Sequence, residues 1–164
     1  AAAVLTDSTG HRPRILIGKD TRQSGDMLEA VMNNYEENEF IVKAAAPADY
    51  RVKNFSIHKI KAKELSLELE KTPDIAKAVG AVKGDRKLII FSAETDDLIE
   101  NARKKLAAKN ADMVVANDVT KEGAGFNVDT NIATIITKAG KVYDYDIMPK
   151  SRLAEIILDH MHEL

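Results

Sequence analysis

Two lysines on one predicted helix are the residues whose spacing points most directly to chemistry. Residues 96–109 have helical spacing, and at about 100° per residue Lys105 and Lys109 fall on the same stripe as the apolar Leu98 and Ala102. Near a helix end, such lysines could extend along apolar surface and complement the helix dipole. Alternatively, they could point into a pocket and bind an anion such as phosphate. The pattern alone leaves both interpretations open.

A long polar segment, residues 49–63, carries a second group of basic residues. Asp49 opens it directly after a predicted strand, where a carboxylate could hold Mg²⁺ or pair with Arg51, and the spacing favours the pair. The composition is typical of a solvated surface loop, and the alternative is a flap whose lysine closes over a polyphosphate. The basic residues of this segment are Lys53, His58, Lys59, Lys61 and Lys63.

Polar residues and glycines also follow a later predicted strand. Asn117 and Asp118 precede Gly123 and Gly125, and these glycines could let the backbone approach a ligand or simply form a turn. The segment matches neither the P-loop nor the dinucleotide-binding pattern. The four histidines lack zinc-site spacing, and His160 falls among apolar positions, which predicts that it is buried in the core or in an interface.

The composition excludes several classes of protein. The chain has 164 residues, 24 Lys and Arg against 26 Asp and Glu, and no cysteine. A net charge of −2 argues against the basic surface that nucleic-acid binding requires, and the absence of cysteine removes disulfides and thiolate chemistry. The apolar runs are too short to span a membrane, and no signal peptide is recognisable. We therefore expect a cytoplasmic domain that uses carboxylates, lysines, hydroxyls, backbone groups or a bound metal.

Short apolar runs alternate with helical segments along the chain. The predicted strands are residues 14–17, 40–44, 65–69, 87–91 and 113–116, followed by a hairpin of residues 132–136 and 142–145. Predicted helices begin at Ser24, at Pro73 with Thr72 as its cap, at residue 96 and at Ser151. This order predicts an α/β fold with a mostly parallel sheet, helices on both faces and a late β-hairpin. Ligands of such sheets bind at the carboxyl ends of the strands.

Several segments, in the correct order, resemble the phosphopantothenoylcysteine synthetase family, the C-terminal half of a bifunctional bacterial protein of coenzyme A biosynthesis. The resemblance covers residues 27–164 and includes Leu67-Glu-Leu-Glu-Lys-Thr-Pro73-Asp74-Ile75. The other matching segments are residues 44–51, 59–61, 91–95, 107–110 and 115–131.

This resemblance implies a Rossmann-like fold that forms a homodimer, partly through its late strands. It also implies a ligase that uses CTP and Mg²⁺. In the family reaction, 4′-phosphopantothenate attacks CTP to give an acyl-cytidylate and pyrophosphate, and cysteine then displaces CMP to form an amide. Because two polyanions meet, Mg²⁺ and lysines must neutralise their charge.

The resemblance also assigns roles to individual residues. Lys59 corresponds to the catalytic lysine of a flap, and Asp49 would contact the nucleotide or its metal. Phe91 would pack near the cytosine or ribose, and Lys105 and Lys109 would reach the nucleotide. The nucleotide-binding residues implied are Ala45, Asp49, Lys59, Pro73, Asp74, Ile75, Ala76, Phe91, Lys105 and Lys109.

The first part of the chain departs from this pattern. Residues 1–30 lack the Gly-rich loop and catalytic Asn of a synthetase, and instead resemble an early segment of phosphoglucosamine mutase through the motif in residues 12–30. Arg22 there is either a surface arginine or a remaining anion-binding residue. We expect a single domain, residues 1–164, that combines the two origins and whose ligase activity is impaired. The alternative is a non-catalytic chimera that keeps the fold and at most nucleotide binding.

Overall fold

The computed structural model describes residues 15–18, 24–54, 56, 58–61, 64–121, 123, 124 and 128–164, with side chains from residue 28 onward. Its elements are β1 (Ile15–Gly18), α1 (Ser24–Asn34), η1 (Tyr35–Glu37), β2 (Phe40–Lys43), β3 (Tyr50–Val52), β4 (Leu69–Lys71), α2 (Ile75–Val82), β5 (Lys87–Glu94), α3 (Leu98–Ala108), β6 (Met113–Asp118), β7 (Thr130–Thr137), β8 (Val142–Pro149) and α4 (Lys150–Met161). None of the helices in these ranges has the length and apolar character that crossing a bilayer requires.

Six strands form one mixed sheet in the order β1-β2-β5-β6-β7-β8. The first four run parallel, with Ile90 of β5 opposite Val114 of β6. β7 and β8 form an antiparallel hairpin that places Ile136 opposite Val142. Gly140 takes a φ of 88° in its turn, a conformation that favours glycine. The predicted parallel strands and late hairpin are confirmed.

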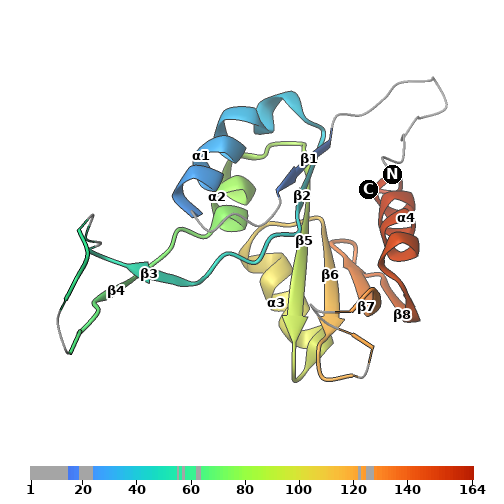
Figure 1. Ribbon diagram of the computed structural model, residues 1–164. Helices are drawn as coiled ribbons and strands as arrows, with labels where there is room; N and C mark the ends of the chain where they lie inside the picture. The colour runs from blue at the N-terminus through green and yellow to red at the C-terminus, as the bar shows by residue number, and fades with distance from the viewer. Residues whose placement is uncertain are drawn as a thin grey trace.

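Helices cover both faces of this sheet (Figure 1). Side chains alternate between the faces along each strand. Ile90 of β5 packs with Val79 of α2 and Ala102 of α3 in one core, to which α1 also contributes. Ile89 packs with Leu153 of α4 in the core on the opposite face. The α/β class with helices on both faces is therefore confirmed, with α1, α2 and α3 on one side and α4 on the other.

A two-stranded arm, β3 with β4, projects from the side of the sheet (Figure 1). The prediction of a strand over residues 65–69 with one buried face is wrong, because β4 covers Leu69–Lys71 and the leucines with alternating spacing are all more than half exposed. The arm lies outside both cores, so this alternation faces no core within the described part of the chain. Among the described residues of 50–71, the exposed large apolar side chains are Tyr50, Val52, Ile60, Leu65, Leu67 and Leu69.

The start of α2 differs from the sequence-based prediction. Asp74, rather than Thr72, is the N-cap, because its Oδ1 accepts a hydrogen bond of 3.1 Å from the backbone N–H of Lys77. Thr72 is already used, since its hydroxyl donates to the backbone oxygen of Ala48 at 2.5 Å. Pro73 therefore precedes the cap instead of opening the helix.

The start of α4 also differs from the prediction. The helix begins at Lys150, so Ser151 lies inside its first turn and Pro149 occupies the cap position without a side-chain hydrogen bond. The backbone N–H of Lys150 instead donates to the backbone oxygen of Asp129 at 2.9 Å. The backbone oxygen of Asp129 thus accepts a hydrogen bond from one N–H group at the start of α4, where Ser151 was expected to act as the cap.

Candidate functional site

Charged side chains gather at the carboxyl edge of the sheet, on the face that α2 and α3 cover. Lys43 is the last residue of β2, Asp74 caps α2, and Lys109 is the C-cap of α3. Ligands of parallel α/β sheets bind at this edge. The structure therefore brings Lys109 and Asp74 together where the sequence predicts a site, and adds Lys43 to them.

Asp74 and Lys109 form an ion pair, with 3.3 Å between Oδ2 and Nζ. Burial alone would raise the pKa of Asp74, but the backbone N–H of Lys77 and the ammonium groups of Lys109 and Lys43 outweigh it, so the pKa lies below its usual value. The carboxylate is thus ionised at neutral pH and neutralises part of the positive charge around it.

Lys43 lies in the same cluster and is partly buried. Burial lowers the pKa of its ammonium group, and the nearby charge of Lys109 lowers it further, against the opposing effect of Asp74 and Asp49. Two ammonium groups thus share the charge of Asp74 at this edge. A bound anion would relieve the repulsion between them, which makes the cluster suitable for phosphate.

A glycine fixes Lys109 relative to α2. A Cβ on Gly80 would lie 1.8 Å from the backbone oxygen of Lys109, so only glycine allows the helix to approach the end of α3 this closely. The side-chain amide of Asn110 donates to the backbone oxygen of Gly80 at 2.8 Å and holds the two segments together. These contacts hold the Lys109 backbone against the last turn of α2, and from there its side chain reaches Asp74 at the start of the helix.

The first turn of α2 offers backbone donors next to these cations. Ile75 and Ala76 are buried with Ala45, which follows β2, so the apolar side of the turn is anchored in the core. The N–H groups of a first helical turn lack partners within the helix and favour anions. Asp49 is held nearby, because its backbone oxygen accepts a 2.9 Å hydrogen bond from Thr72. The predicted residues that lie together here are Ala45, Asp49, Pro73, Asp74, Ile75, Ala76 and Lys109.

Lys105 points toward the same edge but has different partners. Its Nζ donates to Oγ of Ser92 at 2.8 Å and to Oε1 of Glu94 at 2.6 Å, and the Ser92 hydroxyl also donates to Glu94. The Glu94 side chain is only 8% exposed, against 42% for Lys105. Lys105 is therefore turned inward, as its place on the helix predicts, and it neutralises a buried carboxylate.

Phe91 lies on the other face of the sheet, because it is one residue from Ser92 and Ile90 along β5. It lines a hollow of about 280 Å³ beside α4, together with Asn117 and Asn131. The amide of Asn131 donates to Oδ1 of Asn117 at 2.9 Å. The sheet therefore separates Phe91 from the lysine cluster, and its contact with the same nucleotide stays a prediction.

Lys59 lies in the arm between β3 and β4, where it is exposed. The arm points away from α2 and α3 (Figure 1). Within one chain, the structure therefore does not bring Lys59 to the cluster of Lys43, Asp74 and Lys109, and its catalytic role stays a prediction.

The predicted pair between Asp49 and Arg51 is wrong. Arg51 instead bonds across the arm to Glu70, with 2.7 Å between Nε and Oε1, because the two residues are opposite each other in β3 and β4. Lys53 pairs with Glu68 at 3.5 Å in the same way. His58, Lys59 and Lys61 are exposed, as a solvated segment predicts, and Lys63 lies outside the described residues.

Asp49 is the residue that the sequence offers for a metal. Among the residues that the structure describes, no three His, Asp or Glu side chains are grouped as a metal cage. Mg²⁺ commonly binds through one or two carboxylates together with substrate phosphates. An exposed carboxylate beside the cluster of Lys43, Asp74 and Lys109 fits that mode, in which the phosphates of a ligand supply further oxygen atoms to the metal.

Three residues of this edge were not predicted from the sequence. Lys43 interrupts an apolar strand at its carboxyl end, and Ser92 and Glu94 are two residues apart and so share one face of β5. Each pattern is visible in the sequence. However, only the pairing of the neighbouring strands shows that these residues lie at the same edge of the sheet as the predicted lysines. Arg22 lies outside the described residues.

Comparison with known proteins agrees with the motifs. Residues 8–164 match the family described as the DNA/pantothenate metabolism flavoprotein C-terminal domain. The coenzyme A biosynthesis bifunctional protein CoaBC of Bacillus subtilis is 43% identical over 145 residues, which cover 87% of this chain and 36% of that protein. CoaBC of Vibrio cholerae is 37% identical over 147 residues, covering 86% of this chain and 37% of that protein.

A crystal structure of the C-terminal domain of CoaBC is also similar, with a TM-score of 0.72 and 38% identity over 91% of this chain and 74% of that one. The chain spans little more than a third of the length of these two CoaBC proteins. Most of residues 1–30 lie inside the family match, which begins at residue 8. The chain therefore belongs to the family of the DNA/pantothenate metabolism flavoprotein C-terminal domain.

Proposed function

We propose that this chain is a cytoplasmic ligase domain that joins 4′-phosphopantothenate to cysteine in coenzyme A biosynthesis, with CTP as the activating nucleotide. The CoaBC relatives support the pathway. A Cab2 variant in complex with phosphopantothenate-cysteine shares the fold, with a TM-score of 0.62 at 16% identity. The observation that carries the proposal is the cluster of Lys43, Asp74 and Lys109 at the first turn of α2.

The reaction needs the chemistry that this cluster offers. The carboxylate oxygen of 4′-phosphopantothenate attacks the α-phosphorus of CTP, and the bond to pyrophosphate breaks. The amine of cysteine then attacks the acyl carbon, loses a proton and expels CMP, which leaves an amide. Lys43, Lys109 and the N–H groups of α2 bind the phosphates and lower the repulsion between the two anionic substrates. Glu94 holds Lys105 at the same edge.

Asp49 would bind the Mg²⁺ that accompanies the triphosphate, which neutralises phosphate charge. Phe91, on the opposite face, would pack against the cytosine or ribose. The hollow beside Phe91 contains the amides of Asn117 and Asn131, which can donate to or accept from a polar substrate.

The arm supports a homodimer. Its exposed apolar side chains lie outside both cores of one chain, and a second copy of the same chain would cover them. Because the arm of one chain does not reach its own lysine cluster, Lys59 would have to act on the cluster of the other chain in such a dimer. We expect a sedimentation mass of two chains, and Leu67→Lys with Leu69→Lys should return the monomer mass, whereas a monomeric wild type would contradict the dimer.

Calorimetric titration of CTP with Mg²⁺ tests the site. Lys109→Ala should weaken CTP binding about tenfold or more, because a hydrogen bond to a charged group contributes about 1.5–3 kcal/mol. Lys104→Ala is the matched control on the same helix, since Lys104 is exposed and pairs only with Glu100 among described residues. Equal CTP affinity in wild type and Lys109→Ala would overturn the assignment.

Pyrophosphate release with CTP, 4′-phosphopantothenate and Mg²⁺ tests the reaction. Lys59→Ala should slow this release while CTP affinity stays near that of wild type, because Lys59 would act on charge that develops during the reaction. CTP binding without any pyrophosphate release at high protein concentration would instead favour the non-catalytic chimera.

A further inference from the structure

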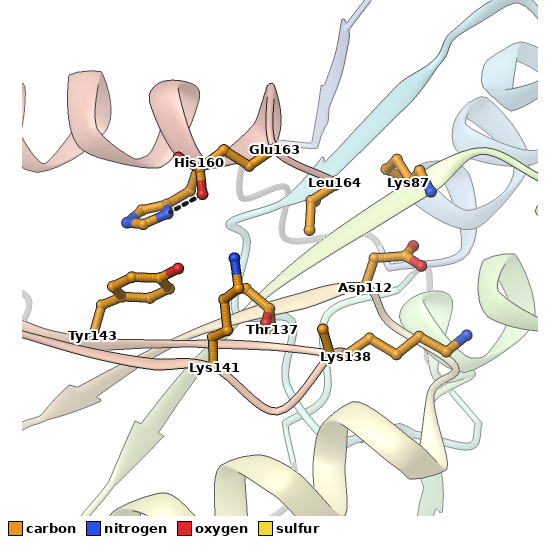
Figure 2. Close-up of a pocket in the computed structure, with 10 residues that line it drawn as sticks. Lys87, Asp112, Thr137, Lys138, Lys141, Tyr143, His160, Glu163 and Leu164 are labelled. Carbon is orange, nitrogen blue, oxygen red and sulfur yellow. Dashed lines mark ion pairs between the residues drawn. The ribbon is translucent and has the colours of Figure 1, made fainter.

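A second cavity lies at the opposite, amino edge of the sheet. Its volume is about 350 Å³, within the range of small-molecule sites. The walls come from the start of β5, the segment before β6, the β7–β8 turn and the end of α4 (Figure 2). None of Lys43, Asp74 and Lys109 lines this cavity, and the proposed ligase reaction does not use it.

One charge at the base of the cavity is already neutralised. Asp112 pairs with Lys83 at 2.8 Å, and these side chains are 9% and 5% exposed. The backbone N–H of Leu88 also donates to Asp112 at 2.7 Å. Because Asp112 has these two partners, its carboxylate does not compensate the other lysines that line the cavity.

Three further lysines line the cavity: Lys87, Lys138 and Lys141. Lys138 donates to the neutral amide oxygen of Asn110 at 2.9 Å. Within the described part of the chain, the ammonium groups of Lys87 and Lys141 have no ion-pair partner. Figure 2 shows Lys141 reaching from the hairpin toward the end of α4. Glu163, exposed at the rim, is the only other side-chain carboxylate of the described lining, so the side chains of the lining are positive overall.

A buried hydroxyl in the same lining lacks a partner. Thr137 is 8% exposed, and its Oγ1 is the one buried side-chain oxygen or nitrogen of the described residues without a hydrogen bond. An unsatisfied buried hydroxyl costs about 1–3 kcal/mol. Thr137 stands next to Lys141 in the hairpin, since its backbone N–H donates to the Lys141 oxygen at 3.0 Å. A ligand oxygen reaching it past the exposed Lys141 side chain would provide the missing acceptor.

The remaining wall is rigid. His160 of α4 is buried, its Nε2 lies 2.6 Å from the Tyr145 hydroxyl, and its ring centroid is 4.3 Å from that of Tyr143. These contacts fix the end of α4 over β8. The packed rings of His160 and Tyr143 thus form one wall of the cavity, beside the hairpin residues Thr137 and Lys141.

We propose that this cavity is a second anion site, which binds a small molecule through a phosphate group of two negative charges. Lys141 supplies the opposing charge beside Thr137, and the Thr137 hydroxyl donates a hydrogen bond to a phosphate oxygen. Lys87 and Lys138 add to the positive charge of the lining. The site is independent of CTP binding at the other edge.

Titration with inorganic phosphate, followed by ¹H–¹⁵N correlation spectra, tests the proposal. We expect saturable shifts of the amide signals of residues 137–141 and 160–164, with chloride at equal ionic strength giving none. In Lys109→Ala, which removes a cation of the other edge, these shifts should persist. Phosphate shifts confined to the first turn of α2, or equal shifts with chloride, would overturn the second site.

Two variants make the test specific. Lys141→Gln should weaken phosphate binding at residues 137–141 about tenfold or more, and Thr137→Val about threefold to tenfold, as expected for a charged and a neutral hydrogen bond. Lys104→Gln, an exposed lysine far from the cavity, should bind as wild type does. Thr137→Val should also melt no earlier than wild type, because its hydroxyl lacks a partner in the protein. Wild-type phosphate affinity in both variants would contradict the proposal.

Discussion

The two edges of the sheet carry the same residue types but expose them differently to water. At the amino edge, Lys83 and Asp112 are 5% and 9% exposed and form a sealed pair. At the carboxyl edge, Lys105 and Lys109 are 42% and 24% exposed and pair with Glu94 and Asp74. A sealed pair stabilises the fold only while both members are present, whereas an open pair can exchange its partner for a ligand. Burial, not residue type, therefore separates the sealed pair from the two pairs that a ligand could open.

The sealed pair gives the largest expected effect. Lys83→Met should lower the free energy of unfolding by about 3–5 kcal/mol, because it leaves the charge of Asp112 buried without a cation. The denaturation midpoint in urea measures this loss. Lys104→Met, which removes an exposed pair with Glu100, is the control and should cost less than about 1 kcal/mol.

A double variant separates the charge from the packing. Adding Asp112→Asn to Lys83→Met removes the unpaired charge and keeps an oxygen for the N–H of Leu88, so part of the lost stability should return. If Lys83→Met unfolds at the same urea concentration as Lys104→Met, the amino-edge pair is not structural and the contrast between the edges fails.

The loss of stability expected for Lys105→Met lies between the losses expected for Lys83→Met and Lys104→Met. Lys105→Met leaves Glu94 with Ser92 alone, and because water reaches Lys105 we expect a loss of about 1–2 kcal/mol in the same urea measurement. Glu94→Gln in the Lys105→Met background should recover part of it. A loss as large as that of Lys83→Met would show that the carboxyl edge is as sealed as the amino edge.

Regular elements could be predicted from the sequence because their signals are local. The apolar runs near residues 87–91 and 113–116 and the hairpin around Gly140 require only periodicity and turn chemistry. The helix caps were harder to predict, because Thr72 is engaged by Ala48, a residue far away in the sequence. The exposed leucines of the arm have the alternating pattern of a half-buried strand. Periodicity alone does not show whether the surface that would bury them belongs to the same chain or to another.

The candidate site was predictable in part for the same reason. The spacing of Lys105 and Lys109 predicts that both lie on the apolar stripe of one helix, and in the structure Lys109 is the C-cap of that helix. Their partners Glu94 and Asp74 lie on other elements, so only the fold identifies them. Likewise, the opposite orientation of Phe91 follows from strand register rather than from any motif.

The smallest expected effect comes from Asp74 and depends on pH. Its pKa is lowered from the ordinary 3.8, so its charge contributes stability above that value, which is lost as the pH falls through the lower folded pKa. Asp74→Asn keeps a good helix cap and removes the charge, so at pH 7 it should cost less than about 1 kcal/mol. Because the folded pKa lies below 3.8, the difference from wild type should shrink only below that pH, as urea unfolding curves would show. A difference that persists at lower pH would mean that Asp74 acts through the cap alone, and that the carboxyl edge holds its lysines without it.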